Sequence, residues 1–281
     1  MREYTSLDVG SEWRIFFAES HLGASITEQI ESFLISGAAP ENWVRLKSSE
    51  NTNVWKFPAN NRWFVFKEYL KRGPFDGIKA LIRGSRARRA WMNGRTLNQE
   101  GLPTPEIVGF GERLSFPFVK RDFLVTEFIP DALGIYTFLN EILTFPLTKE
   151  QVTLKRAVIR SFGAFIGRLH AKGFAHGDLR LDNILITGWR GKQYKFFLID
   201  NERNRYFSKG IPDLYRMINL VQLNMLVLPQ VTFADRIRFF RAYLTENHEL
   251  IPVEKEWMRN VFLKTRKRLQ KKMPGIWESS R

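Results

Sequence analysis

The stretch His176-Gly-Asp-Leu-Arg-Leu-Asp-Asn183 decides the fold class of this 281-residue sequence. It is followed by Ile184-Leu-Ile186 and Phe197-Leu-Ile-Asp200, two apolar runs typical of short buried strands. Transfer of a phosphate from ATP needs a carboxylate near the acceptor hydroxyl and hard oxygen ligands for Mg²⁺. On a tight loop, Asp178 can supply the carboxylate, while Asn183 and Asp200 can supply the ligands. Each residue taken alone would more simply cap a turn.

This arrangement resembles the catalytic loop of protein kinases, His-x-Asp-x-x-x-x-Asn followed by a later metal-binding Asp. The resemblance implies that Asp178 is the catalytic carboxylate and that Asn183 and Asp200 bind the metal. Arg180 stands where protein kinases have a loop lysine, so we expect it to bind the transferred phosphate. An exposed arginine without a role is an equally good interpretation. Gly177 replaces the usual arginine, as in small-molecule kinases, or only eases a turn.

A strand rich in aromatic residues, Arg62-Trp-Phe-Val-Phe-Lys67, is the third of three strands expected over residues 43–70. Val65 and Lys67 are two residues apart, so they share one face of the strand. We expect Val65 to contact adenine and Lys67 to reach the phosphates of ATP. Without its place in this run of strands, Lys67 would be an ordinary surface lysine.

The run Leu124-Val-Thr-Glu-Phe-Ile129 lies where a protein kinase has the hinge that holds adenine. Backbone groups of Glu127 and Phe128 are therefore candidate partners for adenine. A plain buried strand would explain the apolar residues of this run equally well.

Helix signals complete the architecture. Ser85–Glu100 is expected as a helix capped by Ser85, and Thr148–Lys172 as a helix opened by a capping box of Thr148 and Gln151. Strands dominate the first half of the chain and helices the second. The sequence therefore predicts a bilobal α+β fold of the protein-kinase type, with a β-rich N-lobe over residues 41–130 and a helical C-lobe over residues 131–281. Residues 1–40 are expected as an N-terminal extension with one short amphipathic helix, which is opened by a capping box at Ser25-Ile-Thr-Glu28 and ends near Gly37 and Pro40.

The amino-acid composition limits the classes of protein to which this chain can belong. With 44% hydrophobic residues the chain can build a core, and with no cysteine it can hold neither disulfides nor thiolate metal sites. No apolar run is long enough to span a membrane, and no signal peptide is visible, so we expect a cytoplasmic protein. The net charge of +15 favours anionic partners.

Two further motifs, Ser85-Arg-Ala-Arg-Arg-Ala-Trp91 and Gly101-Leu-Pro-Thr-Pro105, make the chain similar to the bacterial lipopolysaccharide kinase family over roughly residues 43–225. That family includes the Kdo and core-heptose kinases. The resemblance implies an enzyme that uses ATP and Mg²⁺ to phosphorylate a sugar hydroxyl of the lipopolysaccharide inner core. It also implies a location at the cytoplasmic face of the inner membrane.

The sequence departs from the protein-kinase pattern in three places. Ser48-Ser-Glu-Asn-Thr-Asn53 stands where a glycine-rich loop would cover the phosphates, and no helix glutamate is found near Ala90 to pair with Lys67. Asp200 is followed by Asn-Glu instead of Phe-Gly. Asp213, after Pro212, is expected either to brace the catalytic loop or simply to cap a helix.

Other functions remain open. A kinase of another small molecule fits the loop but not the basic surface. A pseudokinase that regulates cell-envelope synthesis fits the missing glycines and glutamate. Nucleic acid is an unfavoured partner because no recognition motif is present.

The C-terminal tail is basic, and such a tail fits either an anionic membrane surface or solvent. Its basic residues are Arg259, Lys264, Arg266, Lys267, Arg268, Lys271 and Lys272, and Trp257, Phe262 and Trp277 lie close by in the sequence. No oligomeric state is predicted.

Overall fold

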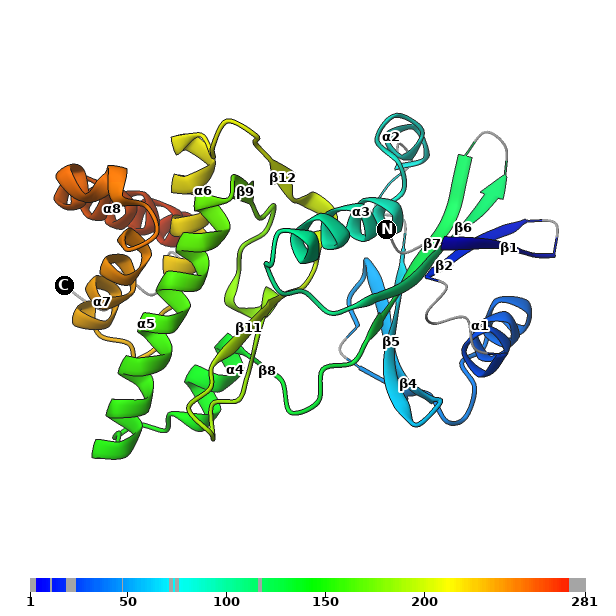
Figure 1. Ribbon diagram of the computed structural model, residues 1–281, viewed down its shortest axis with the longest axis horizontal. Coiled ribbons are helices and arrows are strands. Elements are labelled where there is room, and N and C mark those ends of the chain that lie inside the picture. Colours follow the sequence, from blue (N-terminus) through cyan, green and yellow to red (C-terminus); the bar gives the residue numbers. More distant parts are fainter. Residues whose placement is uncertain are drawn as a thin grey trace. The chain divides into compact units, whose positions relative to one another are not determined.

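The computed structural model describes residues 4–10, 12–18, 24–46, 48–70, 73, 76–115 and 118–272. The chain divides into two compact units, Met1–Pro130 and Asp131–Arg281. The first is built around a sheet and the second mainly from helices (Figure 1). The predicted α+β class is therefore confirmed.

The described residues of the first unit form a seven-stranded antiparallel sheet in the order β1-β2-β6-β7-β5-β4-β3. The strands are β1 (Tyr4–Val9), β2 (Trp13–Ala18), β3 (Val44–Arg45), β4 (Thr52–Ala59), β5 (Arg62–Tyr69), β6 (Ile107–Ser115) and β7 (Phe118–Glu127). The helices are α1 (Ala24–Ser36), α2 (Asp76–Arg83) and α3 (Arg86–Gln99).

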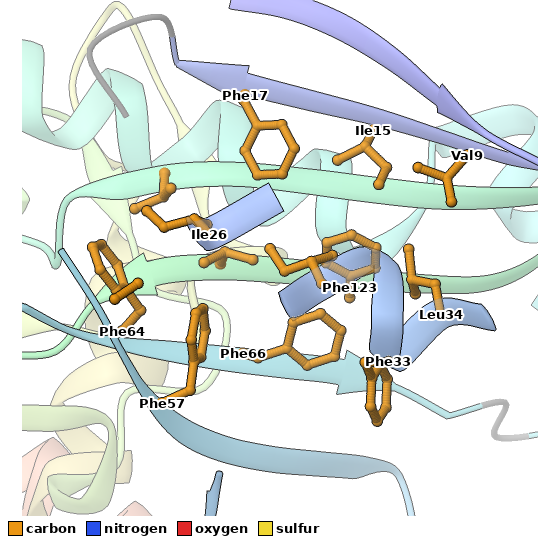
Figure 2. Packing of buried hydrophobic residues seen from close by; sticks show 14 of the residues in the cluster. Val9, Ile15, Phe17, Ile26, Phe33, Leu34, Phe57, Phe64, Phe66 and Phe123 are labelled. Carbon is orange, nitrogen blue, oxygen red and sulfur yellow. The ribbon is translucent and has the colours of Figure 1, made fainter. Parts of the chain in front are cut away.

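The N-terminal residues belong to this sheet and its core. The described part of residues 1–40, expected as an extension with one helix, supplies that helix as α1 and also the two strands β1 and β2. Apolar side chains of α1 recur at helical spacing and pack on aromatic rings of the sheet, including Phe66 and Phe123 (Figure 2). Phe66 is stacked on Phe123 with ring centroids 4.7 Å apart. The alternating buried residues of β2, from Trp13 to Phe17, are the period-two signal of this strand.

Helix α3 packs against a second cluster on the sheet, which contains Ala90 together with Tyr69 and Leu124. Its predicted cap is confirmed, because the Ser85 side chain accepts a hydrogen bond from the Arg88 backbone N–H at 3.0 Å. Phe64 and Phe66 of β5 face the α1 core, so period-two alternation places Val65 and Lys67 on the other face of the strand.

The second unit contains the long helix α5 (Lys149–Ala171), whose capping box of Thr148 and Gln151 is present as predicted. Helices α6 (Asp213–Asn224), α7 (Phe233–Leu244) and α8 (Glu254–Lys272) follow later in the chain. The short strands are β8 (Leu133–Gly134), β9 (Phe174–Ala175), β10 (Ile184–Thr187), β11 (Lys195–Leu198) and β12 (Arg205–Tyr206). The short helical segments are α4 (Ile135–Thr137), η2 (Phe138–Ile142), η3 (Leu181–Asn183), η4 (Asn201–Arg203) and η5 (His248–Val253). Among the described residues, β10 pairs with β11 and β8, and β9 with β12.

Candidate functional site

The loop that begins at His176 is fixed by that buried side chain. The His176 Nδ1 atom lies 3.1 Å from the Asp178 backbone N–H, which donates to it. The Nε2 atom lies 3.0 Å from the Ile199 carbonyl oxygen and therefore carries the proton. Burial lowers the pKa of His176, although its bonds to Ile199 and Asp178 oppose the shift. The uncharged ring thus joins the loop to the segment before Asp200 through two hydrogen bonds.

Asp178 remains accessible on this loop. Its side chain is 31% exposed, and its Oδ2 atom accepts a hydrogen bond from the Arg180 guanidinium at 2.7 Å. Only one donor of Arg180 is used in this bond, and 60% of the arginine side chain is exposed. The pair therefore places a carboxylate and a planar cation side by side at the surface of this unit.

Asn183 is buried and its amide has a defined orientation. The Nδ2 atom donates to the Asp178 carbonyl oxygen at 2.8 Å, which leaves Oδ1 as the acceptor atom of the side chain. The backbone of Asn183 also accepts a hydrogen bond from the Ile199 N–H at 3.0 Å. Both backbone polar groups of Ile199 are thus bonded to the loop, one to Asn183 and the other to His176.

Asp200 follows Ile199 directly and has left-handed backbone angles, φ 63° and ψ 42°. This conformation costs a non-glycine residue about 1 kcal/mol, and Asp and Asn tolerate it best. The adjacent Asn201 is buried and donates from Nδ2 to the Leu198 carbonyl oxygen at 3.1 Å. The strained residue is therefore held between anchored neighbours, a pattern that accumulates at functional sites.

The residues present fit a magnesium ion. Asp200 offers carboxylate oxygens and Asn183 an oriented amide oxygen, which are hard donors of the kind Mg²⁺ prefers. Among the described residues, no cluster of three or more His, Cys, Asp or Glu side chains could hold a metal by itself. A site with two protein ligands agrees with this, because Mg²⁺ in phosphoryl-transfer sites takes its other ligands from phosphates and water.

The loop is braced from α6 by amides that sequence inspection missed. Asn219 donates to the His176 carbonyl oxygen at 2.7 Å and accepts from the His176 N–H at 3.0 Å, while Gln222 accepts from the Leu179 N–H at 3.1 Å. Asp213, for which bracing the loop was one of two expected roles, is 77% exposed in the first turn of α6, so it lies at a helix start as the other interpretation had it. The bracing amides were missed because a buried amide in mid-helix leaves no local sequence signal.

A buried chain of polar groups supports Asn219. The His170 Nε2 atom lies 3.2 Å from Asn219 Oδ1, and His170 Nδ1 lies 3.0 Å from the Tyr243 hydroxyl. Arg216 donates to the same hydroxyl at 2.9 Å. Burial lowers the pKa of His170 to about 3, with the nearby Arg216 acting in the same direction and the Asn219 bond opposing it. His170 is therefore neutral in the folded protein at neutral pH.

We expect the protein to lose stability as the pH falls below about 6.5. The unfolded chain binds a proton at His170 near its usual pKa, whereas the folded chain does not until about pH 3. The free energy of unfolding should therefore fall by about 2 kcal/mol between pH 7.5 and pH 5 from this residue alone. His176 acts in the same direction. Urea unfolding at a series of pH values measures the effect.

The exposed His248 provides the control for this prediction. Replacing it by glutamine should leave the pH dependence of unfolding unchanged. A stability that stays flat from pH 7.5 to pH 5 would contradict a buried neutral His170.

The structure gives a steric reason for glycine at position 177, which the sequence could not show. A Cβ atom at this position would lie 2.2 Å from the Cβ and 2.3 Å from the backbone oxygen of Arg203. No side chain fits there unless the backbone moves. The arginine that eukaryotic protein kinases carry at this point therefore cannot be accommodated, and the segment after Asp200 packs directly on the loop.

In the first unit, Lys67 lies on β5 opposite Leu124 of β7, and its Nζ atom is 5.3 Å from the centre of the Tyr69 ring. Lys67 and Val65 lie on the same face of β5, as expected, and this face is opposite the one that packs on α1. Helix α3, Arg86–Gln99, contains no Asp or Glu, and the buried Ala90 occupies the region where a partner glutamate was sought.

The backbone of the expected adenine-binding segment is partly engaged. The Glu127 N–H donates to the Glu106 carbonyl oxygen and the Phe128 N–H donates to the Trp63 carbonyl oxygen, both at 2.8 Å. Neither N–H can donate to adenine while these bonds persist. The sequence could not show this, because the partners are set by strand register.

The turn before β4 closes on itself. Ser49 and Thr52 exchange backbone hydrogen bonds of 2.9 Å and 3.3 Å, and their hydroxyl oxygens lie 3.0 Å apart. The Asn51 N–H donates to the Ser49 hydroxyl at 3.3 Å. The polar side chains that replace a glycine-rich loop therefore first satisfy the turn itself.

Comparison with known proteins gives one family and relatives that all bear the same name. Residues 77–243 match the Lipopolysaccharide kinase (Kdo/WaaP) family. The lipopolysaccharide core heptose(I) kinase WaaP of Pseudomonas aeruginosa is 27% identical over 161 residues, which are 56% of this chain and 59% of that protein. WaaP of Escherichia coli K12 is 24% identical over 162 residues, with the same coverage of 56% and 59%. The matched region thus spans 59% of the length of these relatives.

A solved structure, WaaP in complex with acyl carrier protein, superimposes with a TM-score of 0.59. The match covers 79% of this chain and 87% of that one at 22% sequence identity. At this identity the likeness shows a shared fold.

Proposed function

Because the chain belongs to the lipopolysaccharide kinase (Kdo/WaaP) family, we propose that it transfers a phosphate from ATP to a sugar hydroxyl of the lipopolysaccharide inner core, on Kdo or heptose. The observation that carries the proposal is the attachment of Ile199 to the loop through His176 and Asn183. These bonds hold the segment before Asp200 against the loop that carries Asp178.

The side chains of the second unit have the groups that the reaction requires. Asp178 accepts the proton of the sugar hydroxyl as that oxygen bonds to the γ-phosphorus of ATP and the bond from this phosphorus to ADP breaks. Arg180 binds the oxygens of the transferred group. Asn183 and Asp200 would hold Mg²⁺. When bound, the ion neutralises negative charge on the phosphate oxygens. Phosphoryl transfer depends mainly on positioning and electrostatics, which suits a loop braced by Asn219.

The first unit supplies the nucleotide contacts in this proposal. Lys67 binds phosphate oxygens, and Val65 on the same face of β5 packs against adenine. The carbonyl oxygen of Glu127 accepts from adenine. Since the N–H groups of Glu127 and Phe128 are engaged, the next amide, that of Ile129, is the better donor.

A peripheral location at the cytoplasmic face of the inner membrane forms part of the proposal. None of the described helices is long and apolar enough to cross a membrane. Phe262 and Leu263 of α8 are about half exposed among basic side chains, which suits an anionic surface. Trp257, expected at this surface, is buried instead, and Trp277 lies outside the described residues.

A second candidate, a pseudokinase that regulates cell-envelope synthesis, is favoured by the lack of an acidic residue in α3. One experiment separates the two. The purified chain is incubated with radiolabelled ATP, Mg²⁺ and dephosphorylated lipopolysaccharide core, and label in the core is counted. Calorimetry measures ATP binding in parallel. Transfer supports the kinase; binding of Mg²⁺–ATP without transfer contradicts the proposed acceptor; absence of both favours the pseudokinase.

A further inference from the structure

The segment after the candidate metal ligand is fastened to the catalytic loop. Its strand β12 pairs with β9, so that Arg205 lies opposite Ala175. Asn204 accepts a hydrogen bond from the Gly177 N–H at 3.4 Å. Ala175 precedes Asp178 by three residues, a span of at most about 11 Å. β12 therefore runs beside the chain segment that leads to Asp178, the carboxylate proposed to act on the acceptor.

Arg205 is an exposed cation whose observed partners are uncharged. Its guanidinium donates to the Tyr215 hydroxyl and lies 5.0 Å from the centre of the Tyr215 ring. Tyr215 is itself packed on Phe207, with ring centroids 4.9 Å apart. Among the described residues no Asp or Glu pairs with Arg205. Neutral partners thus hold the side chain in one place and leave its charge available.

The surrounding chain has the same sign of charge. Residues 203–212 contain Arg203, Arg205 and Lys209 and no acidic residue. The side chain of Arg203 is 51% exposed, and its neighbour Glu202 is buried. A fixed guanidinium in a basic surrounding recognises carboxylate or phosphate through paired N–H donors.

We propose that Arg205, held by Tyr215, binds an anionic substituent of the sugar acceptor, a carboxylate or a phosphate. This inference rests on the proposed function. It assigns acceptor recognition to the segment that follows Asp200, and it gives the positive charge of residues 203–209 a defined role. Arg205 pairs with Ala175, and Ala175 precedes Asp178 by three residues, so the proposed anchor and the proposed base belong to neighbouring segments of this unit.

Steady-state kinetics of the full chain test the inference with inner-core oligosaccharide that lacks only the phosphate on the acceptor hydroxyl and keeps its carboxylates and other phosphates. Arg205→Gln should raise the KM for the oligosaccharide about tenfold or more, since a charged hydrogen-bonding partner is lost. The KM for ATP should stay unchanged. Tyr215→Phe keeps the ring but removes the hydroxyl that holds Arg205, so it should raise the acceptor KM by a smaller factor.

A matched control exists in the same unit. Arg190 also lies over an aromatic ring, 4.4 Å from the centre of Trp189, on the turn between β10 and β11. Arg190→Gln removes the same charge and should leave the acceptor KM unchanged. Thermal melting of each variant checks that the fold is retained.

Two modified acceptors identify the anionic group. One is dephosphorylated oligosaccharide with reduced carboxyl groups, and the other has reduced carboxyl groups but keeps the phosphates outside the acceptor hydroxyl. The Arg205→Gln penalty should disappear on the acceptor that lacks the bound group. A full penalty on the acceptor without either group overturns the inference. An unchanged acceptor KM in Arg205→Gln, with normal transfer by the wild type, overturns the inference alone. A wild type without transfer overturns the proposed function as well.

Discussion

Asp178→Asn should lower kcat for phosphate transfer by about 10²–10⁴-fold, the usual contribution of a positioned general base. Asparagine has the shape of aspartate but cannot accept the proton of the attacking hydroxyl. The substitution also removes the charge that pairs with Arg180. The affinity for Mg²⁺–ATP should stay within about twofold of the wild type, because Asp178 is not a proposed metal ligand. Single-turnover transfer assays measure the first quantity and calorimetry the second.

Asp182 is the matched control for this substitution. It lies on the same loop, is exposed and carries the same charge. Asp182→Asn removes that charge without touching the proposed base, so transfer should be close to normal. Equal losses in the two variants would mean that the charge of the loop matters and no single carboxylate acts as the base. Normal transfer in Asp178→Asn would remove this residue from the mechanism.

The elements that sequence predicts best are those with strong local signals. The helices starting after Ser85 and Thr148 and the strand Ile184–Thr187 are confirmed, because caps, periodicity and glycine stops are encoded within a few residues. The N-terminal strands were missed although Trp13, Ile15 and Phe17 are buried at every second position. Their pairing partner β6 begins about ninety residues later, and only the folded sheet shows that connection.

In the candidate site too, residues with local spacing could be predicted from the sequence, whereas contacts between distant segments could not. Asp178, Asn183 and Asp200 were predicted because their spacing is local. In the structure, Ile199, which precedes Asp200, donates to the Asn183 carbonyl oxygen, and the Asn183 side chain donates to the Asp178 carbonyl oxygen. Their chemical roles stay predictions. The brace by Asn219 depends on a contact across 43 residues that no local pattern encodes. The occupied N–H of Phe128 likewise depends on the register between β5 and β7.

Asp200→Asn should abolish detectable transfer and remove the Mg²⁺ dependence of ATP binding. The carboxylate supplies the only negative charge among the two proposed protein ligands, and an amide in its place binds Mg²⁺ far more weakly. Asparagine is the informative substitute because it tolerates the left-handed backbone at φ 63° nearly as well as aspartate. Alanine would add backbone strain of about 1 kcal/mol. The measurement is the rise in melting temperature caused by ATP with Mg²⁺ or with EDTA.

Asp131 offers a control of the same residue type in the same conformation. It is exposed and has φ 55°, so Asp131→Asn tests the substitution in a left-handed position outside the loop. Both variants should melt at the wild-type temperature without ligand, since neither backbone has to change. With Mg²⁺–ATP, Asp131→Asn should gain the full wild-type shift, whereas Asp200→Asn should gain only the shift seen in EDTA. A full shift in Asp200→Asn would exclude this carboxylate as the metal ligand and return the choice to another oxygen of the loop.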